Sequence, residues 1–171
     1  MRTVVLLLAN ALTLLGQAAQ VHYLPTNPGA TIQSGKWSVA NSSTNLVITN
    51  PLGATTTIAK AAAVTQSVTV FALPAQAMVL SCVVKSGTAF TGTTTLTATL
   101  GITGTLTACV STPYNLMAAV SAANFSAVLP ATPIVSYVGT NLILALTSTV
   151  QNISSVSAGS VDVTITWQVL P

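Results

Sequence analysis

Hydrophobic and polar residues alternate most regularly in the last segment of the chain, residues 159–171, which reads GSVDVTITWQVLP. Every second position from 161 to 169 is apolar, and the positions between them are polar. A period of two predicts a β-strand that buries one face. Pro171 cannot donate a backbone hydrogen bond, so we expect the strand to end there.

Shorter segments of the same kind recur from about residue 37 onward, separated by turns rich in Gly, Pro, Ser and Asn. Many short strands at close spacing predict an all-β protein, an antiparallel β-sandwich that is jelly-roll-like. Two segments differ: residues 59–64 favour one helical turn, and residues 114–124 a short helix or a loop that crosses the sheet. The other predicted strands are 37–39, 44–49, 55–58, 65–73, 78–85, 93–100, 134–138 and 141–148.

The alternation also predicts which side chains form the core. In residues 78–85, the face with Leu80, Cys82 and Val84 is interpreted as the buried one. Phe90 is expected to place its ring in the core between turns at 86–87 and 91–92. The full predicted core set is Val68, Val70, Leu80, Cys82, Val84, Phe90, Leu144, Val163, Ile165 and Trp167.

The N-terminus has a different character. Arg2, an apolar run over 4–15 and a small-x-small cleavage site at Gly16-Gln17-Ala18 follow the order of a secretory signal. The preferred hypothesis is a retained arm that packs against neighbouring subunits, and a membrane anchor is the third option, disfavoured by the interspersed amides. The proposed arm contacts are Val4, Leu7, Leu12, Leu15 and Tyr23.

Residues 21–36 contain two prolines and two glycines, which predict an extended linker. His22, the single histidine of the chain, lies in this linker and is interpreted as solvated or packed. We therefore divide the chain into an N-terminal arm and linker, 1–36, and a β-sandwich domain, 37–171.

Charged side chains are scarce: the chain has four Lys plus Arg and one acidic residue among 171, whereas about a quarter of an average domain is charged. The four cations, Arg2, Lys36, Lys60 and Lys85, are scattered, so we expect no nucleic-acid binding despite a pI near 9.2. Only residues 3–22 approach a membrane-spanning run, and a membrane partner is not expected. A neutral, Thr-rich β surface favours contact with other subunits.

The inventory of reactive groups argues against an enzyme. Paired carboxylates need two acids, and Asp162 is the single one. The chain contains no Gly-x-Ser-x-Gly, no Gly-rich phosphate loop and no cluster of metal ligands. We predict no catalytic residues, no cofactor and no metal. Asp162 is interpreted as solvated, the alternatives being a turn cap or a pair with a lysine.

Cys82 and Cys109 are interpreted as two core thiols, because free cysteine is among the most buried residue types. A disulfide is the alternative if the protein is exported. Asn-x-Ser triplets begin at Asn41, Asn124 and Asn152 and would be glycan acceptors in a secreted protein, although chance matches are expected in a chain so rich in Ser and Asn.

The run at 70–101, VFALPAQAMVLSCVVKSGTAFTGTTTLTATLG, resembles a segment of small structural proteins of tailed bacteriophages. In those proteins a strand ends in a Leu-Pro-Ala turn, and a Thr-Ala-Phe-x-Gly turn leads into a Thr-rich strand. YNLMAAVSAANF, GTNLILALTSTVQNIS and the C-terminal segment resemble the same proteins, so the likeness covers 65–171. It implies a β-sandwich virion component: a head decoration or cement protein, a head-fibre base or a tail-associated subunit. The hydrophobic N-terminus departs from this group.

The favoured hypothesis is a non-enzymatic virion protein of a tailed phage, most simply a capsid decoration or cement protein assembled in the host cytoplasm. Its partners would be the major capsid protein or neighbouring subunits, and it would form a homo-oligomer, for which a trimer suits local threefold points. The alternative is an exported filament subunit or surface adhesin with a cleaved signal, which would donate an N-terminal strand. A carbohydrate-binding sandwich is a third class, and its candidate aromatic residues are Trp37, Trp167, Tyr23, Tyr114 and Tyr137. Of these, Trp167 shares the valine face of the last strand and is interpreted as core.

Overall fold

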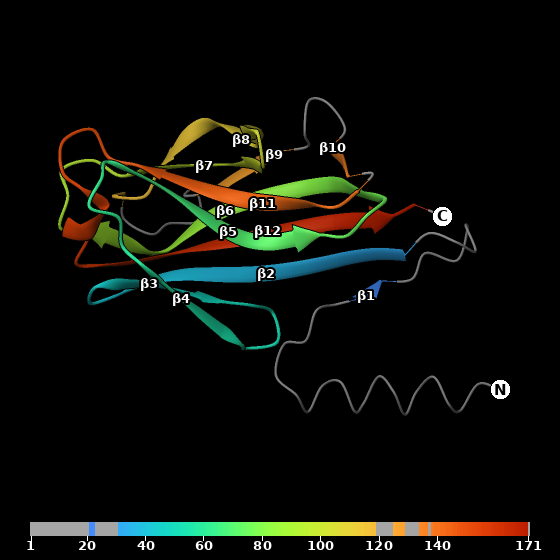
Figure 1. Cartoon of the computed structure of the whole chain (residues 1–171), viewed down its shortest axis with the longest axis horizontal. Helices are drawn as coiled ribbons and strands as arrows, with labels where there is room; N and C mark the ends of the chain where they lie inside the picture. The colour runs from blue at the N-terminus through green and yellow to red at the C-terminus, as the bar shows by residue number, and fades with distance from the viewer. Residues whose placement is uncertain (1–20, 23–30, 119–124, 129–133, 137, 171) are drawn as a thin grey trace.

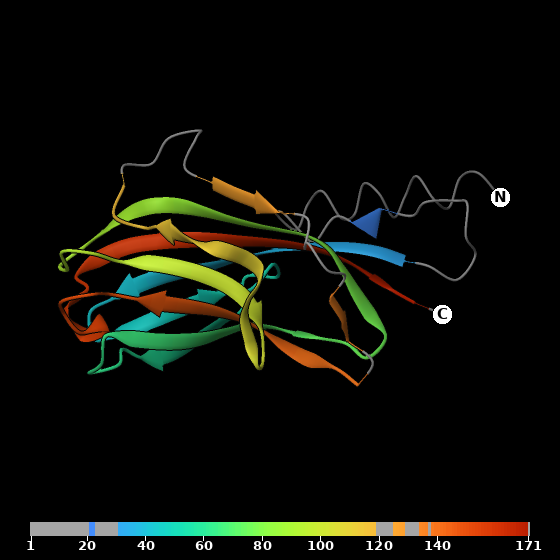
Figure 2. The ribbon, with the colours of Figure 1, turned by 90° about the horizontal axis from the view of Figure 1, so that it is seen from above.

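The computed structural model describes residues 21–22, 31–118, 125–128, 134–136 and 138–170. In this part of the chain, strands dominate and the one helical element is a short 3-10 turn, η1 (Ile153–Ser155). The strands form two antiparallel sheets that pack face to face (Figure 1, Figure 2). The predicted all-β antiparallel sandwich is confirmed.

The larger sheet has the strand order β10-β6-β12-β2-β3-β4, with β1 also paired to β2 and β9 to β6. Figure 1 shows its three long strands, β2, β12 and β6, side by side. The final strand is central because it pairs with β2 along one edge and β6 along the other. The strands are β1 (Val21–His22), β2 (Thr31–Ser42), β3 (Asn45–Thr49), β4 (Thr55–Ala59), β6 (Ala77–Thr91), β9 (Phe125–Val128), β10 (Ile134–Ser136) and β12 (Ala158–Val169).

The smaller sheet has the order β5-β11-β7-β8. Its strands are β5 (Thr65–Leu73), β7 (Thr97–Ile102), β8 (Thr105–Asn115) and β11 (Thr140–Thr147). The chain passes repeatedly from one sheet to the other, for example between β5 and β6, β6 and β7, and β11 and β12. This jelly-roll-like connectivity ties the two layers together at both ends of the sandwich.

The core lies between the two sheets, where apolar residues of alternate strand positions meet. Nine residues of the predicted core set are buried: Val68, Val70, Cys82, Val84, Phe90, Leu144, Val163, Ile165 and Trp167. Leu80 is only half-buried. The pairing of β12 with β6 shifts between Thr166, opposite Ser81, and Trp167, opposite Val79. This bulge moves the inward face of β6 from Cys82 to Val79, and Leu80 turns away from the core.

Several local predictions need correction. Residues 86–87 are not a turn, because β6 continues through them and pairs with β12 up to Thr91. Residues 60–64 form no helical turn. Instead, the Gln66 side chain accepts a hydrogen bond from the Ala61 N–H at 2.9 Å and donates one to the Ala59 carbonyl at 2.8 Å. These side-chain bonds hold the segment as a loop, so tertiary context overrides helix propensity.

The strands also extend beyond the predicted limits. β2 begins at Thr31, so the end of the predicted linker is part of the sheet. Tyr114 and Asn115 belong to β8, residues 116–118 are a bend, and 119–124 lie outside the described residues. Three strands, β1, β8 and β9, were not predicted from the sequence. β8 was missed because its inward and outward residues do not alternate strictly: Cys109 and Val110 are both buried.

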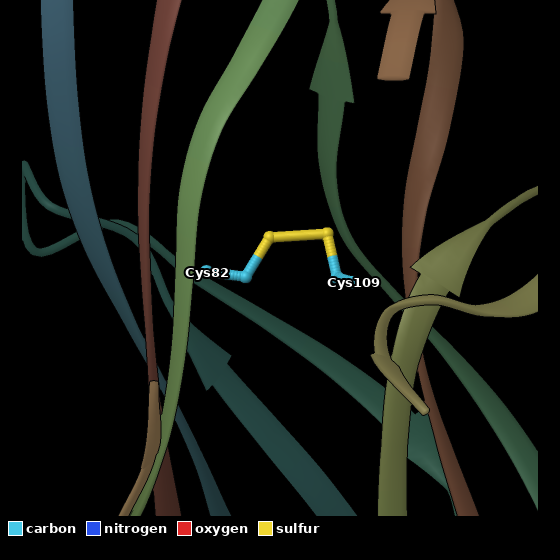
Figure 3. Close-up of a disulfide and its surroundings, with 2 residues drawn as sticks. All are labelled: Cys82 and Cys109. Atoms are coloured by element: carbon cyan, nitrogen blue, oxygen red, sulfur yellow. A yellow bond between two sulfur atoms is a disulfide. The ribbon is translucent and has the colours of Figure 1, made fainter. Parts of the chain in front are cut away.

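The two cysteines join the sheets. Cys82 lies on β6 and Cys109 on β8, with their Cα atoms 5.9 Å apart, and a disulfide connects them across the core (Figure 3). The interpretation as two core thiols is therefore wrong, although both residues are buried as expected. Sequence alone could not pair them, because the pairing depends on β8 packing opposite β6.

Gly159, at the start of β12, has a positive φ of 121°, and a Cβ at this position would contact the ring and Cα of Phe90. Gly53 also has a positive φ, 83°, but a Cβ added there would have no other atom within 4 Å. We expect Gly53→Ala to cost about 1 kcal/mol of unfolding free energy, from backbone strain alone. Gly159→Ala should cost about 3 kcal/mol, because overpacking adds to the strain. Urea denaturation of both variants would measure the difference, and equal losses would contradict the predicted contact with Phe90.

Candidate functional site

The ionisable side chains in the described part of the chain are dispersed. No group of three or more His, Cys, Asp or Glu residues lies close enough there to hold a metal ion. Asp162 lies on the outer face of the larger sheet, where its Oδ2 accepts a hydrogen bond from Lys36 Nζ at 3.2 Å. Lys85 is the cross-strand partner of Asp162 on β6. Asp162 is thus paired with a lysine of the same chain rather than free in solvent, and an exposed pair of this kind contributes little stability.

Lys60 takes a structural position at the end of the sandwich where β4 leads into β5. Its Nζ donates to Asn41 Oδ1 at 3.0 Å and to the Val156 carbonyl. Asn41 Nδ2 in turn donates to the Ser157 carbonyl at 2.8 Å. Because a glycan would occupy this same amide nitrogen, the geometry disfavours Asn41 as a glycan acceptor. Asn152 is exposed, and Asn124 lies outside the described residues.

One concave feature of the described residues is an open groove of about 410 Å³ between the two sheets, at the edge where β4 and β5 lie. Its lining is mostly apolar and contains no charged residue. The principal apolar lining residues are Trp37 of β2, Ile48 of β3, Ile58 of β4, and Val70 and Phe71 of β5.

Aromatic rings form the floor at one end of this groove. Phe71 lies between two tryptophans, with its ring centroid 4.7 Å from that of Trp37 and 4.7 Å from that of Trp167. Both tryptophans are buried, whereas Phe71 is half-buried. Such tilted aromatic contacts add about 0.5–1.5 kcal/mol beyond area burial, so packing among these rings stabilises the apolar floor of the groove.

Two sheet edges border the groove. β4 pairs only with β3, and β5 pairs only with β11, among the described strands. Neither β4 (TTTIA) nor β5 (TQSVTVFAL) contains a charged residue or a proline, the devices that normally protect an edge from pairing with another strand. β5 carries a bulge where Val70 is skipped in its pairing with β11, but β4 pairs with β3 without a shift in register. β4 is therefore the less protected edge.

The residues proposed for the arm, Val4, Leu7, Leu12, Leu15 and Tyr23, lie outside the described residues. His22 belongs to β1, where it pairs with Ile32 of β2. Since β12 occupies the other edge of β2, β1 lies on the same edge as β3 (Figure 1). β1 thus joins the larger sheet on the side that leads through β3 and β4 to the groove.

The two described aromatic residues outside the predicted core that were considered for sugar binding, Trp37 and Tyr114, do not form an exposed platform. Trp37 is only 5% exposed. Tyr114 is half-buried, and its hydroxyl accepts a hydrogen bond from the Ser86 backbone N–H at 3.4 Å. Tyr23 and Tyr137 lie outside the described residues. The groove was not predicted from the sequence, because strands from both sheets form it. The one feature of the sequence that pointed toward this groove was the absence of charged residues in 55–59.

No protein-family model matches the chain, and no curated protein matches it. Among solved structures, the chain is similar to a chain from the capsid asymmetric unit of cyanophage Pam1. The two share 19% sequence identity and superpose with a TM-score of 0.54 over 89% of this chain and 94% of the other. At this identity the likeness establishes a shared fold across nearly the whole length of both chains.

Among the described residues, there is no helix with the length and hydrophobicity that a membrane crossing requires.

Proposed function

We propose that this chain is a non-enzymatic structural protein of a tailed-phage particle, a decoration or cement subunit that stabilises the capsid through contacts with its neighbours. The observation that carries the proposal is the fold shared, over 89% of this chain and 94% of the other, with a chain from a phage capsid asymmetric unit. The sequence resemblance of residues 65–171 to phage structural proteins supports the same role independently.

The surface chemistry supports association by packing and strand pairing. The described part of the chain contains only three lysines and one aspartate, and two of these residues, Lys36 and Asp162, are paired with each other. Apolar burial contributes about 25 cal/mol per Å² of contact, and an uncharged strand edge adds backbone hydrogen bonds. We accordingly propose that the subunit forms a homo-oligomer on the particle, with a trimer as the specific expectation. Residues 1–36 would contact a neighbour, and the sandwich would lie on or between capsomers.

Reconstitution tests this proposal. Capsids of the encoding virus that lack the protein are mixed with the full-length chain, sedimented, and heated with a dye that reports exposed DNA. We expect the chain to sediment with capsids at a fixed stoichiometry and to raise the temperature at which DNA is released.

Because few charges are available, binding should change less than about threefold between 0.1 and 1 M NaCl, where the Debye length falls from about 10 to 3 Å. A chain that stays in the supernatant at all salt concentrations would contradict the proposed function. Binding lost at 1 M salt would contradict the proposed chemistry of the contact.

The disulfide is the structural observation that favours the second candidate, an exported filament subunit or adhesin, because disulfides form in oxidising compartments. Virion surfaces belong to the same oxidising class, so the disulfide does not separate the two candidates. The intact mass of the native protein does. A full-length chain near 17.2 kDa supports the virion protein. A chain that lacks about its first 18–20 residues supports export.

A further inference from the structure

The groove between β4 and β5 is suited to a neutral, apolar, extended occupant. The polar side chains in its lining, Asn50, Thr56 and Thr69, are uncharged. Nothing in the lining could pair with a charge on a ligand, and burying an unpaired charge is costly. The apolar floor of Trp37 and Phe71 would instead favour aliphatic side chains.

The geometry of the rim favours a β-strand as the occupant. β4 is five residues long, which corresponds to about 17 Å of strand, and its outer edge has no partner among the described strands. A strand that paired with β4 would place alternate side chains over the groove floor, since Thr56 and Ile58 already point to that face and line the groove. Strand addition at an open edge combines backbone pairing with side-chain pockets.

One segment of this chain has the matching chemistry. Residues 3–15, TVVLLLANALTLL, contain no charge, proline or glycine and form the most continuous apolar run of the sequence. The segment lies outside the described residues, but its point of attachment is defined. Val21 pairs with Gln33 of β2. Gly35 lies two residues further along β2, close to the turn that follows β3. A Cβ added to Gly35 would lie 3.1 Å from Cγ of Pro51 in that turn.

We propose that residues 3–15 of a second copy bind in this groove as a strand added to β4. The inference rests on the proposed function, in which copies lie next to one another on the particle. The twenty residues before β1 span up to about 66 Å when extended, which is enough to leave one sandwich and reach the next. Exchange of this segment would give the charge-poor subunit a specific, salt-insensitive contact.

Cysteine cross-linking between two different full-length chains tests the exchange directly. Chains carrying Leu7→Cys, Leu12→Cys or Leu15→Cys are each mixed with chains carrying Thr56→Cys, assembled, and oxidised. Thr57→Cys is the matched control, because Thr57 lies on the same strand with its side chain on the opposite face. At least one arm position should cross-link to Thr56→Cys and give a species of twice 17.2 kDa, and that same position should not cross-link to Thr57→Cys.

A charge placed in the groove provides a second test. Thr56→Lys should weaken self-association at least tenfold, because the ammonium would have to be buried without a partner, and Thr57→Lys should leave it unchanged. Thermal unfolding of both variants shows that they fold. If Thr56→Lys associates normally, or if cross-links form only when both cysteines are on one chain, the proposal is overturned. It is also overturned if the native protein lacks residues 3–15.

The two proposals fail separately. If the wild-type chain sediments with capsids but shows no cross-link between copies, the virion role stands and the groove assignment falls. If the chain does not bind capsids, the virion role falls, and cross-linking in free oligomers still decides what occupies the groove.

Discussion

Loss of the Cys82–Cys109 disulfide should lower the free energy of unfolding by about 3–4 kcal/mol. The bond closes a loop of 27 residues, and the chain-entropy model assigns about that value to a loop of this size. For a domain of 150–250 residues, 1 kcal/mol corresponds to about 2–4 °C, so the melting temperature should fall by about 10 °C on reduction. Both cysteines are buried and the bond connects the two sheets, so its loss also removes a covalent link between the layers of the sandwich.

Differential scanning calorimetry with and without a reductant measures this change. The double variant Cys82→Ala and Cys109→Ala serves as the control, since its melting temperature should not respond to reductant. If the wild-type melting temperature is also unchanged by reductant, and thiol reagents label both cysteines of the unfolded, unreduced chain, the disulfide assignment is wrong.

Leu144→Ala should destabilise the fold by about 3–5 kcal/mol. Leu144 is fully buried on β11, the strand between β5 and β7, where its cross-strand partners are Val68 and Leu100. Truncating a buried leucine removes its transfer free energy and leaves a cavity that the neighbouring strands only partly fill. Because all three residues lie in the interior between two sheets, little relaxation is available to offset the loss.

Leu52→Ala is the matched control, because Leu52 is 79% exposed in the turn before β4. Its substitution should change the unfolding free energy by less than about 0.5 kcal/mol. Equilibrium urea unfolding of both variants, analysed with a common slope, gives the comparison. If the two variants lost similar amounts of unfolding free energy, the burial of Leu144 on β11 would be contradicted.

The alternation of residues along each strand determined much of this fold. Because side chains of a strand point alternately to its two faces, Val163, Ile165 and Trp167 could be assigned to the core from the sequence, and they are buried. The same periodicity, repeated between turn residues, predicted the antiparallel sandwich. The scarcity of acids in the sequence likewise indicated how few groups the chain offers for catalysis.

Tertiary structure alone decided the features that depend on two strands at once. The half-burial of Leu80 follows from a bulge, and the register of β6 against β12 is a property of the pair. The disulfide required β8 to pack opposite β6, and the ion pair of Asp162 required Lys36 on the neighbouring strand. The groove depends on how β4 and β5 lie relative to each other at the edge of the sandwich. Local periodicity specifies which face of a strand is buried, but contacts between residues distant in sequence arise only when the sheets assemble.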